Sequence, residues 1–310
     1  MKFKPMSSKG IKRYPIRDRE GKVSVSDFAS PVAKGSSVRD FLEGLPGILG
    51  ARDLKEVASA VVKAHKAGRT VAVGMGAHVI KAGLGPVIID LIKRVVVSSV
   101  AMNGACVVHD FETAFAGATS EDVDSEITGG RFGMAKETGS ILNKAVNKGV
   151  KRGLGRAAGE LIERSRYPYR DKSILAACVK ADIPATVHVA LGTDILHIHP
   201  EMDGGRTGEA SMRDFQLFCS VVSSLEGGVY INMGSAVILP EVFLKALTLS
   251  RNLGHRVRNI TTVNMDFIQR YRPVTNVVHR PTAGAGAGYS LTGHHEIMVP
   301  LLHAAIIEGL

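Results

Sequence analysis

From about residue 70 onward, short β-branched runs alternate with longer segments whose apolar residues recur at helical spacing. Alternation of this kind is typical of a parallel sheet whose strands are connected by covering helices. The strands that the pattern predicts are Thr70–Val73, Val95–Ala101, Ala185–Ala190, Gly228–Ile231 and Asn259–Val263. The chain is therefore predicted to be an α/β protein with a parallel sheet flanked by helices.

The segments between these strands have the apolar periodicity of helices. The predicted helices are Asp53–Ala67, Pro86–Lys93, Val107–Ala116, Gly139–Arg164, Arg213–Leu225 and Pro240–Arg251. The small-residue run TAGAGAGYS, residues 282–290, predicts a long and flexible loop. No repeat of 20–50 residues interrupts this order, so we expect a single set of alternating elements.

Residues 1–50 do not follow the alternation. They carry four prolines with scattered glycines and serines, which favours an extended arm. A short helix is expected in the stretch SVRDFLEGL, where Ser37 can cap the first turn. We therefore expect an N-terminal arm and short helix over residues 1–50 and a single domain over residues 51–310.

Composition places the chain among globular proteins of the reducing cytoplasm. Of its 310 residues, 45% are hydrophobic and 22% are charged, which argues against disorder. No apolar stretch reaches the ~20 residues of a membrane-spanning helix, and the basic N-terminus lacks the apolar core of a secretory signal. Cys106, Cys178 and Cys219 have no paired spacing and are predicted to be buried, reduced thiols.

The formal net charge of +10 is concentrated in the arm and in the stretch from Lys144 to Lys172. A basic stripe can bind nucleic acid. However, aromatic residues make up only 5% of the chain, Trp is absent, and no nucleic-acid-binding motif is present. A solvated helix face, or one that meets an acidic partner, is the favoured interpretation, and a nucleic-acid partner is not expected.

Small and polar residues follow each predicted strand, where ligands bind in an open parallel sheet. The segments at these exits are Gly74–His78, Asn103–Ala105, Gly192–Asp194, Met233–Ala236 and Asn264–Asp266. Small residues let a ligand approach the backbone, and helix N-termini offer N–H groups to phosphate. Tight turns with capping residues would explain each exit singly. Together, the exits predict a cleft of dinucleotide size.

Several familiar motifs are absent. Gly74-x-Gly76 continues as Ala77-His78-Val79, so the G-x-G-x-x-G fingerprint is not completed. There is no Walker A loop and no G-x-S-x-G nucleophile elbow. His197, His199 and Asp194 or Asp203 are conceivable metal ligands, but their spacing matches no specific metal motif. Single histidines near clefts more often bind substrate or transfer protons, and no metal is expected.

Several blocks of the sequence resemble deoxyhypusine synthases, and more closely a bacterial deoxyhypusine-synthase-like branch. These blocks are GAHVIKAGLGPVIIDLI (76–92), MNGACVVHDFE (102–112), SILAACVKADIPATVHVALGTD (173–194), YINMGSAVILPEVFLKALTLSRN (230–252), TSEDV (119–123), FGMAKETG (132–139) and TGHHEIMVPLL (292–302). The resemblance covers most of the chain from about residue 37. It implies a Rossmann-like, NAD-binding α/β fold and a homotetramer with NAD and substrate in clefts between subunits.

The resemblance also assigns roles to residues. The NAD-site turn of the family corresponds to Asn103, Gly104 and Ala105, and its NAD-contacting glutamate corresponds to His109. Its ribose-side aspartate corresponds to Asp194. The glycine-rich turn before its substrate histidine corresponds to Gly234, Ser235 and Ala236, but the histidine itself is replaced in the stretch around Pro240 and Glu241. True synthases oxidise spermidine with NAD, hold the aminobutyl group on a lysine, and transfer it to a translation initiation factor.

The catalytic lysine of the family has no counterpart here. In true synthases it lies two residues after a tryptophan late in the chain, whereas this sequence has no Trp and reads TAGAGAGYSLTGHHEIM in that region. Lys245 lies inside the predicted helix PEVFLKAL, where a nucleophilic role is not expected. Lys81 could form a Schiff base if it is desolvated, although an exposed side chain is the favoured interpretation. Aminobutyl transfer through the usual lysine adduct is therefore not expected.

Three functions are considered. The first is an NAD-using transferase or oxidoreductase that converts a polyamine or other small amine through an imine. The second is an inactive NAD-binding regulatory protein, and the third is a metal-assisted hydrolase. For the first, the candidate catalytic residues are His109, His294, His295, Glu296 and Lys81; the NAD-binding candidates are Gly76, Asn103, Gly104, Ala105, Asp194, Gly234, Ser235 and Asp266; the substrate-binding candidates are Glu241 and His197.

Overall fold

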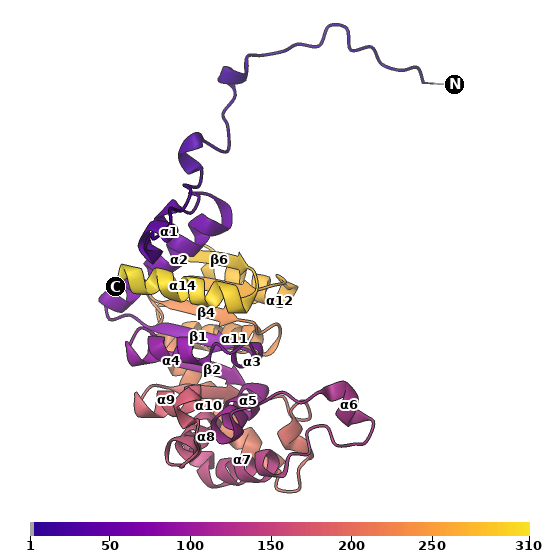
Figure 1. Ribbon diagram of the computed structural model, residues 1–310, viewed down its shortest axis with the longest axis vertical. Helices are drawn as coiled ribbons and strands as arrows, with labels where there is room; N and C mark the ends of the chain where they lie inside the picture. Colours follow the sequence, from indigo (N-terminus) through magenta and orange to yellow (C-terminus); the bar gives the residue numbers. More distant parts are fainter. Residues whose placement is uncertain (1–2) are drawn as a thin grey trace.

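Six parallel strands form the centre of the computed structural model, which describes residues 3–310. The strands are β1 (Val71–Met75), β2 (Ser99–Asn103), β3 (Ala185–His188), β4 (Val229–Met233), β5 (Thr261–Asp266) and β6 (Ala287–Thr292). Their order across the sheet is β3-β2-β1-β4-β5-β6 (Figure 1). The chain thus builds the sheet outward from β1 in one direction and from β4 in the other, which is the strand order of Rossmann folds.

Helices connect the strands and cover the sheet. They are α1 (Val38–Gly44), α2 (Leu49–Lys66), α3 (His78–Lys81), α4 (Gly85–Lys93), α5 (Gly104–Ala116), α6 (Val123–Ile127), α7 (Lys136–Gly149), α8 (Leu154–Glu163), α9 (Ile174–Lys180), α10 (Gly204–Ser223), α11 (Ile238–Asn252), α12 (Tyr271–Pro273), α13 (Arg280–Thr282) and α14 (His295–Gly309), with a π-helical segment at Val274–His279. The fold is therefore the predicted α/β sheet flanked by helices.

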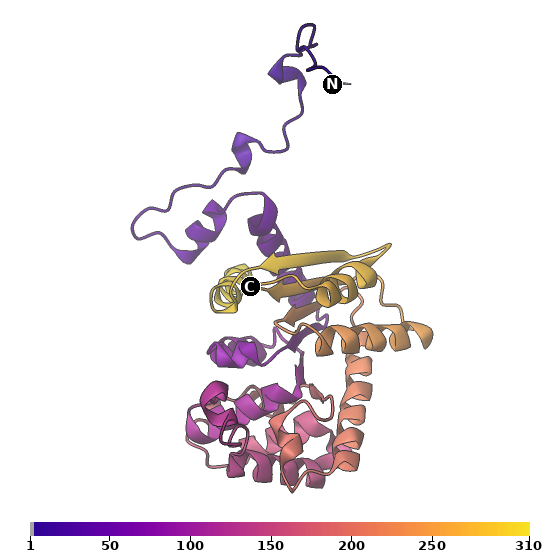
Figure 2. The same ribbon diagram turned by 90° about the vertical axis from the view of Figure 1, so that its right-hand side faces the viewer.

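Two hydrophobic layers hold the helices against the sheet. On one face, α2, α4 and α14 bury residues such as Ile88 and Leu302 against the strands. On the other face, Phe218 of α10 and Phe243 of α11 surround Tyr230, whose ring stacks on Phe243 with 3.9 Å between the centroids. Figure 2 shows the two layers on opposite sides of the sheet. Burial of apolar area at ~25 cal/mol per Å² makes these layers the main source of stability.

All five predicted strands are present, but their ends are shifted. β2 begins at Ser99 rather than at Val95, because Val95 has a φ of 59° and belongs to the turn after α4. β5 extends to Asp266, so Asp266 ends a strand instead of following one. Asn103 likewise ends β2 and also caps α5. The backbones of Asn103 and Asp266 are therefore fixed by the sheet and not by a loop.

The prediction of a loop over residues 282–290 is wrong at its C-terminal part, because β6 begins at Ala287. Gly286 turns into this strand with a φ of 89°. At Gly288 a Cβ atom would lie 2.4 Å from the carbonyl oxygen of Val278. Small residues at this position thus allow close contact with the π-helical segment. The small residues of this segment suggested a flexible loop, whereas in the structure they allow close packing.

The prediction of one helix over Gly139–Arg164 is also wrong. The segment forms α7 and α8, which are separated at Gly153 with a φ of 89°. The buried carboxylate of Asp214 accepts hydrogen bonds from Gly155 N at 2.9 Å and Val187 N at 2.8 Å. A Cβ on Gly153 would lie 1.9 Å from Asp214 Oδ1. A contact from α10, distant in sequence, therefore ends the first helix and begins the second.

The N-terminal residues extend away from the sheet (Figures 1 and 2). The predicted short helix is α1, and its capping box pairs Ser37 with Asp40. α2 begins at Leu49, four residues earlier than predicted. The arm exposes apolar side chains, among them Phe3, Met6 and Val25. The described residues of the arm therefore bury few of their apolar side chains.

Much of the basic stretch between Lys144 and Lys172 is neutralised within the chain. Arg152, Arg156 and Arg164 converge on the carboxylate of Glu160, with N–O distances of 2.6, 2.9 and 3.4 Å. Lys144 lies 3.8 Å from Glu201. The positive charge that the sequence suggests is thus partly balanced by acidic neighbours.

The three cysteines are free and buried, as predicted. Burial raises the pKa of the thiols of Cys106 and Cys178. Over residues 3–310, none of the helices combines the length and the apolar character needed to cross a membrane.

Candidate functional site

The carboxyl ends of β1 and β4 mark the point where the strand order reverses. In this fold the crevice at that point is where ligands bind. Gly76 N donates a hydrogen bond to Met233 O at 2.9 Å. A Cβ on Gly76 would lie 2.4 Å from the carbonyl oxygen of Gly234, and Gly234 has a φ of 66°. The two predicted glycines are thus the residues that let the loops after β1 and β4 meet.

A cavity of about 220 Å³ lies beside this crevice, at the ends of β2 and β3. It brings together four residues predicted from the sequence: Lys81, Ala105, His109 and Asp194. Glu112 and Glu121 also line it. Three carboxylates thus face one lysine and one histidine, and the cavity attracts cationic or hydroxyl-bearing ligands more than anionic ones.

A hydrogen-bonded chain connects His109 to Glu112. His109 Nδ1 lies 2.7 Å from Thr119 Oγ1, which donates to Glu112 Oε2 at 2.5 Å. The other oxygen of Glu112 accepts from Thr138 Oγ1 at 3.0 Å. Burial lowers the pKa of His109; Glu112 opposes this effect and Lys81 reinforces it. His109 is therefore held neutral near pH 7, as a proton acceptor requires.

Asp194 occupies the N-terminal end of α5. A Cβ on Gly104 would lie 2.0 Å from Asp194 Oδ2, and the Asn103 side chain accepts from Cys106 N at 3.1 Å. Burial raises the pKa of Asp194, an effect that His197 opposes. The N-terminal end of α5 thus carries a carboxylate and an amide side chain, and a carboxylate there repels phosphate. This end of α5 suits a hydroxyl or ammonium group better, because either can donate to Asp194.

The other side of the crevice carries Asp266 and His295, both buried. The Nε2 atom of His295 lies 3.2 Å from Met265 O, and within residues 3–310 its Nδ1 atom has no hydrogen-bond partner. Burial lowers the pKa of His295, while Asp266 raises it. The ring of His295 also lies 5.4 Å from that of His78. A Cβ on Gly234 would lie 3.0 Å from His295 Nε2, so the buried imidazole packs directly on the turn after β4.

The remaining predicted residues lie elsewhere or are already paired. His294 stacks on Phe267 with 6.2 Å between the rings and lies 3.8 Å from Glu296, and both His294 and Glu296 are exposed. Glu241, in the first turn of α11, accepts from Asn276 at 2.9 Å and pairs with Lys245. Ser235 accepts from Leu239 N at 3.1 Å and fixes the turn after β4.

The two histidines of the metal alternative make other contacts. His197 Nδ1 accepts from the backbone N atoms of Gly192 and Asp194, each at 3.1 Å. His199 Nε2 lies 2.8 Å from Gly133 O. Across the described residues 3–310, no group of three or more His, Cys, Asp or Glu side chains is arranged to hold a metal ion.

The sequence analysis missed Glu112 and Glu121. It also missed a series of hydrogen-bonded side-chain amides at β4 and β5. Asn232 Nδ2 donates to Asn264 Oδ1 at 2.7 Å, and Asn264 Nδ2 donates to Gln269 Oε1 at 2.7 Å. The spacing of His109 and Glu112 by three residues places them on one helix face, which was a usable signal. The amide pair needed the parallel register of β4 and β5, which the sequence does not supply.

No protein-family model matches the chain, and no curated protein sequence matches it. Solved structures do match. A conserved candidate LOR/SDH protein from Methanococcus maripaludis S2 is 17% identical over 98% of this chain and 75% of that one, with a TM-score of 0.55. A candidate deoxyhypusine synthase from Entamoeba histolytica is 13% identical over 90% and 96%, with a TM-score of 0.53.

The structures of AgrE and ArgZ match as well. AgrE, solved as a ternary complex with ornithine and NAD⁺, is 19% identical over 82% of this chain, with a TM-score of 0.53. The chain spans only 32% of the length of AgrE and 31% of that of ArgZ, an arginine dihydrolase from the ornithine–ammonia cycle in Cyanobacteria. At these identities the similarity shows the fold: the chain has a Rossmann-like α/β fold of the kind found in NAD-binding and deoxyhypusine-synthase-like structures.

Proposed function

We propose that the chain is an NAD-dependent enzyme that acts on a polyamine or another small amine. The observation that carries this proposal is the cavity beside the crevice between β1 and β4, where Glu112, Glu121 and Asp194 lie around His109. Carboxylates in a partly buried cavity stabilise an ammonium group. The structure of AgrE, which holds ornithine and NAD⁺, supports the same combination of cofactor and amine in this fold.

The size of the cavity limits what it can hold. Sites for drug-sized ligands usually measure about 300–1,000 Å³, so a cavity of about 220 Å³ takes one part of a dinucleotide or a small amine. The rest of NAD would lie along the crevice, over the turns after β1 and β4 that meet at Gly76 and Gly234. Asp194 would accept from a ribose hydroxyl.

The chemistry that bound NAD⁺ would supply is hydride acceptance from the carbon that carries the amino group, so that an amine which has lost one proton to this chain becomes a protonated imine. The residues of this chain would hold the amine and remove its proton. Glu121 would bind the ammonium end, and neutral His109 would accept a proton at Nε2. Thr119 and Glu112 would stabilise the protonated ring through Nδ1. The expected product is an imine that is hydrolysed or captured by a second amine.

A lysine adduct is not part of the proposal. Lys81 lines the cavity but is exposed, so it lacks the desolvation that activates a nucleophilic amine. Lys245 pairs with Glu241 on α11. The chemistry therefore rests on proton transfer by His109 rather than on covalent catalysis.

Amine oxidation can be tested directly. Purified chain with NAD should show a rise in the absorbance of the reduced nicotinamide when spermidine, putrescine or ornithine is added. The Glu112→Gln variant should be slower by about 10²-fold or more, the range for loss of acid–base support. NAD binding without turnover over this panel would instead identify the chain as an NAD-binding regulatory protein.

A second copy of the chain would complete this site. Val123 lines the cavity and is 41% exposed. Leu191 and Ile198 lie on either side of the lining segment 193–195 in the sequence and are 57% and 54% exposed. Such a rim beside a polar cavity is typical of a surface that another protein covers. We therefore propose a homo-oligomer, a homotetramer by family resemblance, in which a neighbouring subunit closes the site.

A further inference from the structure

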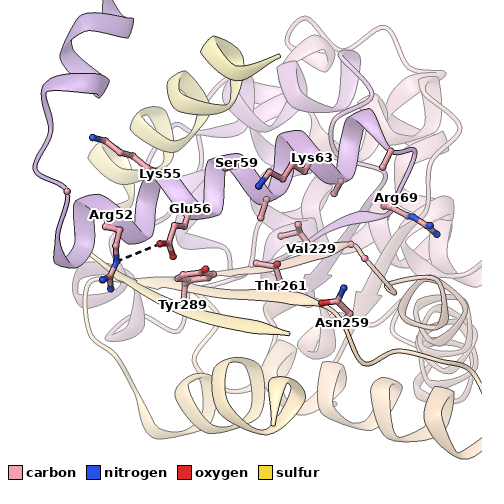
Figure 3. A pocket seen from close by; sticks show the side chains of 16 residues that line it. Arg52, Lys55, Glu56, Ser59, Lys63, Arg69, Val229, Asn259, Thr261 and Tyr289 are labelled. Atoms are coloured by element: carbon pink, nitrogen blue, oxygen red, sulfur yellow. Dashed lines mark ion pairs between the residues drawn. The ribbon is translucent and has the colours of Figure 1, made fainter. Parts of the chain in front are cut away.

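A second hollow lies at the opposite ends of the strands, away from the candidate site. This groove measures about 670 Å³, and its wall is α2. Its floor is formed by Val229 at the start of β4, Thr261 at the start of β5 and Tyr289 of β6. Figure 3 shows α2 passing over these strands with the groove between them. The volume lies within the range of about 300–1,000 Å³ for small-molecule sites.

Positive charge dominates the lining of this groove. Four cationic residues, Arg52, Lys55, Lys63 and Arg69, face one carboxylate, that of Glu56. Two of the cations are engaged. Arg52 lies 3.8 Å from Glu56, and Lys55 Nζ donates to Leu45 O at 2.7 Å.

Lys63 and Arg69 remain available for a ligand. Neither side chain has an ion-pair or hydrogen-bond partner among residues 3–310, and both are exposed. Lys63 lies on α2, whereas Arg69 follows the turn at Gly68 that comes after this helix. The two cations thus enter the groove from different elements, which suits a ligand with more than one anionic group.

Neutral polar groups face the same space. Ser59, Thr261 and Asn259 line the groove (Figure 3), and their side chains make no hydrogen bond within the described part of the chain. Ammonium and guanidinium groups surrounded by hydroxyls and an amide are the donors that bind phosphate oxygens. The Tyr289 ring on the floor offers a flat surface for an aromatic group.

We propose that this groove binds a phosphorylated metabolite of nucleotide size. Lys63, Thr261 and Asn259 would bind one phosphate and Arg69 the next, while Tyr289 would contact the ring of the ligand. This proposal does not depend on the proposed NAD-linked activity, because the groove and the crevice lie at opposite ends of the strands.

Calorimetric titration with ATP, and separately with inorganic phosphate, tests the site. ATP should bind the wild-type chain at low ionic strength and lose affinity as salt is added. Lys63→Met keeps the aliphatic stem and removes the charge, and it should weaken ATP binding about tenfold. Lys148→Met removes an equally exposed charge from α7, at the far end of the molecule, and should change the affinity less than twofold.

Two further variants separate this groove from the crevice. Thr261→Val should weaken ATP binding without removing a charge, whereas Asp194→Ala, in the cavity at the other edge, should leave it unchanged. The proposal is overturned if the chain binds neither ATP nor phosphate. It is equally overturned if Lys63→Met binds ATP as well as the wild type does, or if saturating NAD displaces ATP completely. Weak binding of phosphate with tighter binding of ATP is the expected order, because the ring adds contact with Tyr289.

Discussion

His109 and Glu112 lie three residues apart on α5, so their side chains share one helix face. The hydroxyl of Thr119 joins them, and burial keeps the imidazole neutral near pH 7. A neutral imidazole can accept a proton at Nε2 while its Nδ1 faces the hydroxyl. In the proposed reaction the two residues would act as one unit, with His109 contacting the substrate and Glu112 positioning the His109 ring.

Replacement of Glu112 by Gln should lower the pKa of His109 further, because Glu112 raises it in the wild type. NMR titration of the His109 ring proton measures this shift without any need for substrate. Glu163→Gln, a change at a half-buried residue at the end of α8, is the matched control and should leave the titration unchanged. An unchanged or higher pKa in Glu112→Gln would contradict the proposed pairing.

Asp194→Ala should weaken NAD binding about tenfold, because a hydrogen bond to a charged group contributes about 1.5–3 kcal/mol. Titration of protein fluorescence or heat with NAD measures the change. Asp182→Ala is the control, since the side chain of Asp182 is 87% exposed and lies outside the cavity. Equal affinities in the wild type and Asp194→Ala would remove Asp194 from the cofactor site.

The stability of the chain should depend on the protonation of His188. This residue is buried, its Nε2 lies 3.0 Å from Thr186 Oγ1, and burial lowers its pKa to about 4. An unfolded histidine titrates near 6.5, so the unfolded state binds the proton first as the pH falls. The stability that neutral His188 provides is therefore complete above pH 6.5 and is lost as the pH falls towards 4, by about 3 kcal/mol in total.

Urea unfolding at pH 7 and pH 5 tests this dependence. The loss between these values should be about 2 kcal/mol smaller in His188→Gln than in the wild type. Asp110 acts in the opposite direction, because burial raises its pKa to about 6, so only the difference between the two proteins is diagnostic. His255→Gln, at an exposed histidine, should follow the wild type. Parallel pH profiles for His188→Gln and the wild type would refute the assignment.

Among the helices, the junction of α7 and α8 depends on a single glycine. Gly153 has a φ of 89° and a ψ of 161°, a region that is nearly restricted to glycine. Gly153→Ala should lower the free energy of unfolding by more than the ~1–3 kcal/mol of backbone strain, because the new Cβ would collide with Asp214. Gly254→Ala is the matched control: its φ is 87°, but open space surrounds the Cβ position.

Chemical denaturation of both variants separates strain from collision. If the two alanine variants lose equal stability, contact with Asp214 plays no part in ending α7, and the account of this junction is wrong. A larger loss in Gly153→Ala also explains why the apolar periodicity of residues 139–164 reads as one helix. The break is imposed by Asp214, some sixty positions later in the sequence.

The difference between local sequence patterns and contacts from distant residues also explains which elements could be predicted. β1 and β4 are short apolar runs with a strong local signal, and both were found from the sequence. β6 was missed because its glycine, Gly288, serves close packing against Val278. Its neighbour α14 was missed because Pro300 interrupts the helical signal. Local patterns thus specify elements that bury their own apolar residues, and they fail where a distant contact decides.

The residues of the candidate site could likewise be predicted only in part. Asp194 and Ala105 were placed together by the rule that ligands gather at the carboxyl ends of strands, and the family resemblance added His109. All three residues line one cavity. Ser235 and Asp266 lie across the crevice, outside the lining of that cavity. The sequence reveals which edge of the sheet carries polar residues. The grouping of these residues along the edge depends on the register of the strands.

For the whole molecule, the exposed apolar rim of the cavity predicts assembly. Leu191→Asp combined with Ile198→Asp should reduce the mass of the particle, measured by light scattering after size-exclusion chromatography, and should also weaken NAD binding. Leu253→Asp is the control, because Leu253 is 68% exposed but lies at the end of α11, away from the cavity. A wild-type chain that is monomeric at all concentrations would contradict the proposed oligomer.

Hydrogen–deuterium exchange of the chain with and without NAD tests the central claim most directly, because it reports where the dinucleotide binds without requiring turnover. The account predicts slower exchange at residues 76–79, 103–109 and 234–238, the segments around the crevice at the ends of β1, β2 and β4. Protection confined to the groove beside α2, or no protection at saturating NAD, would contradict it.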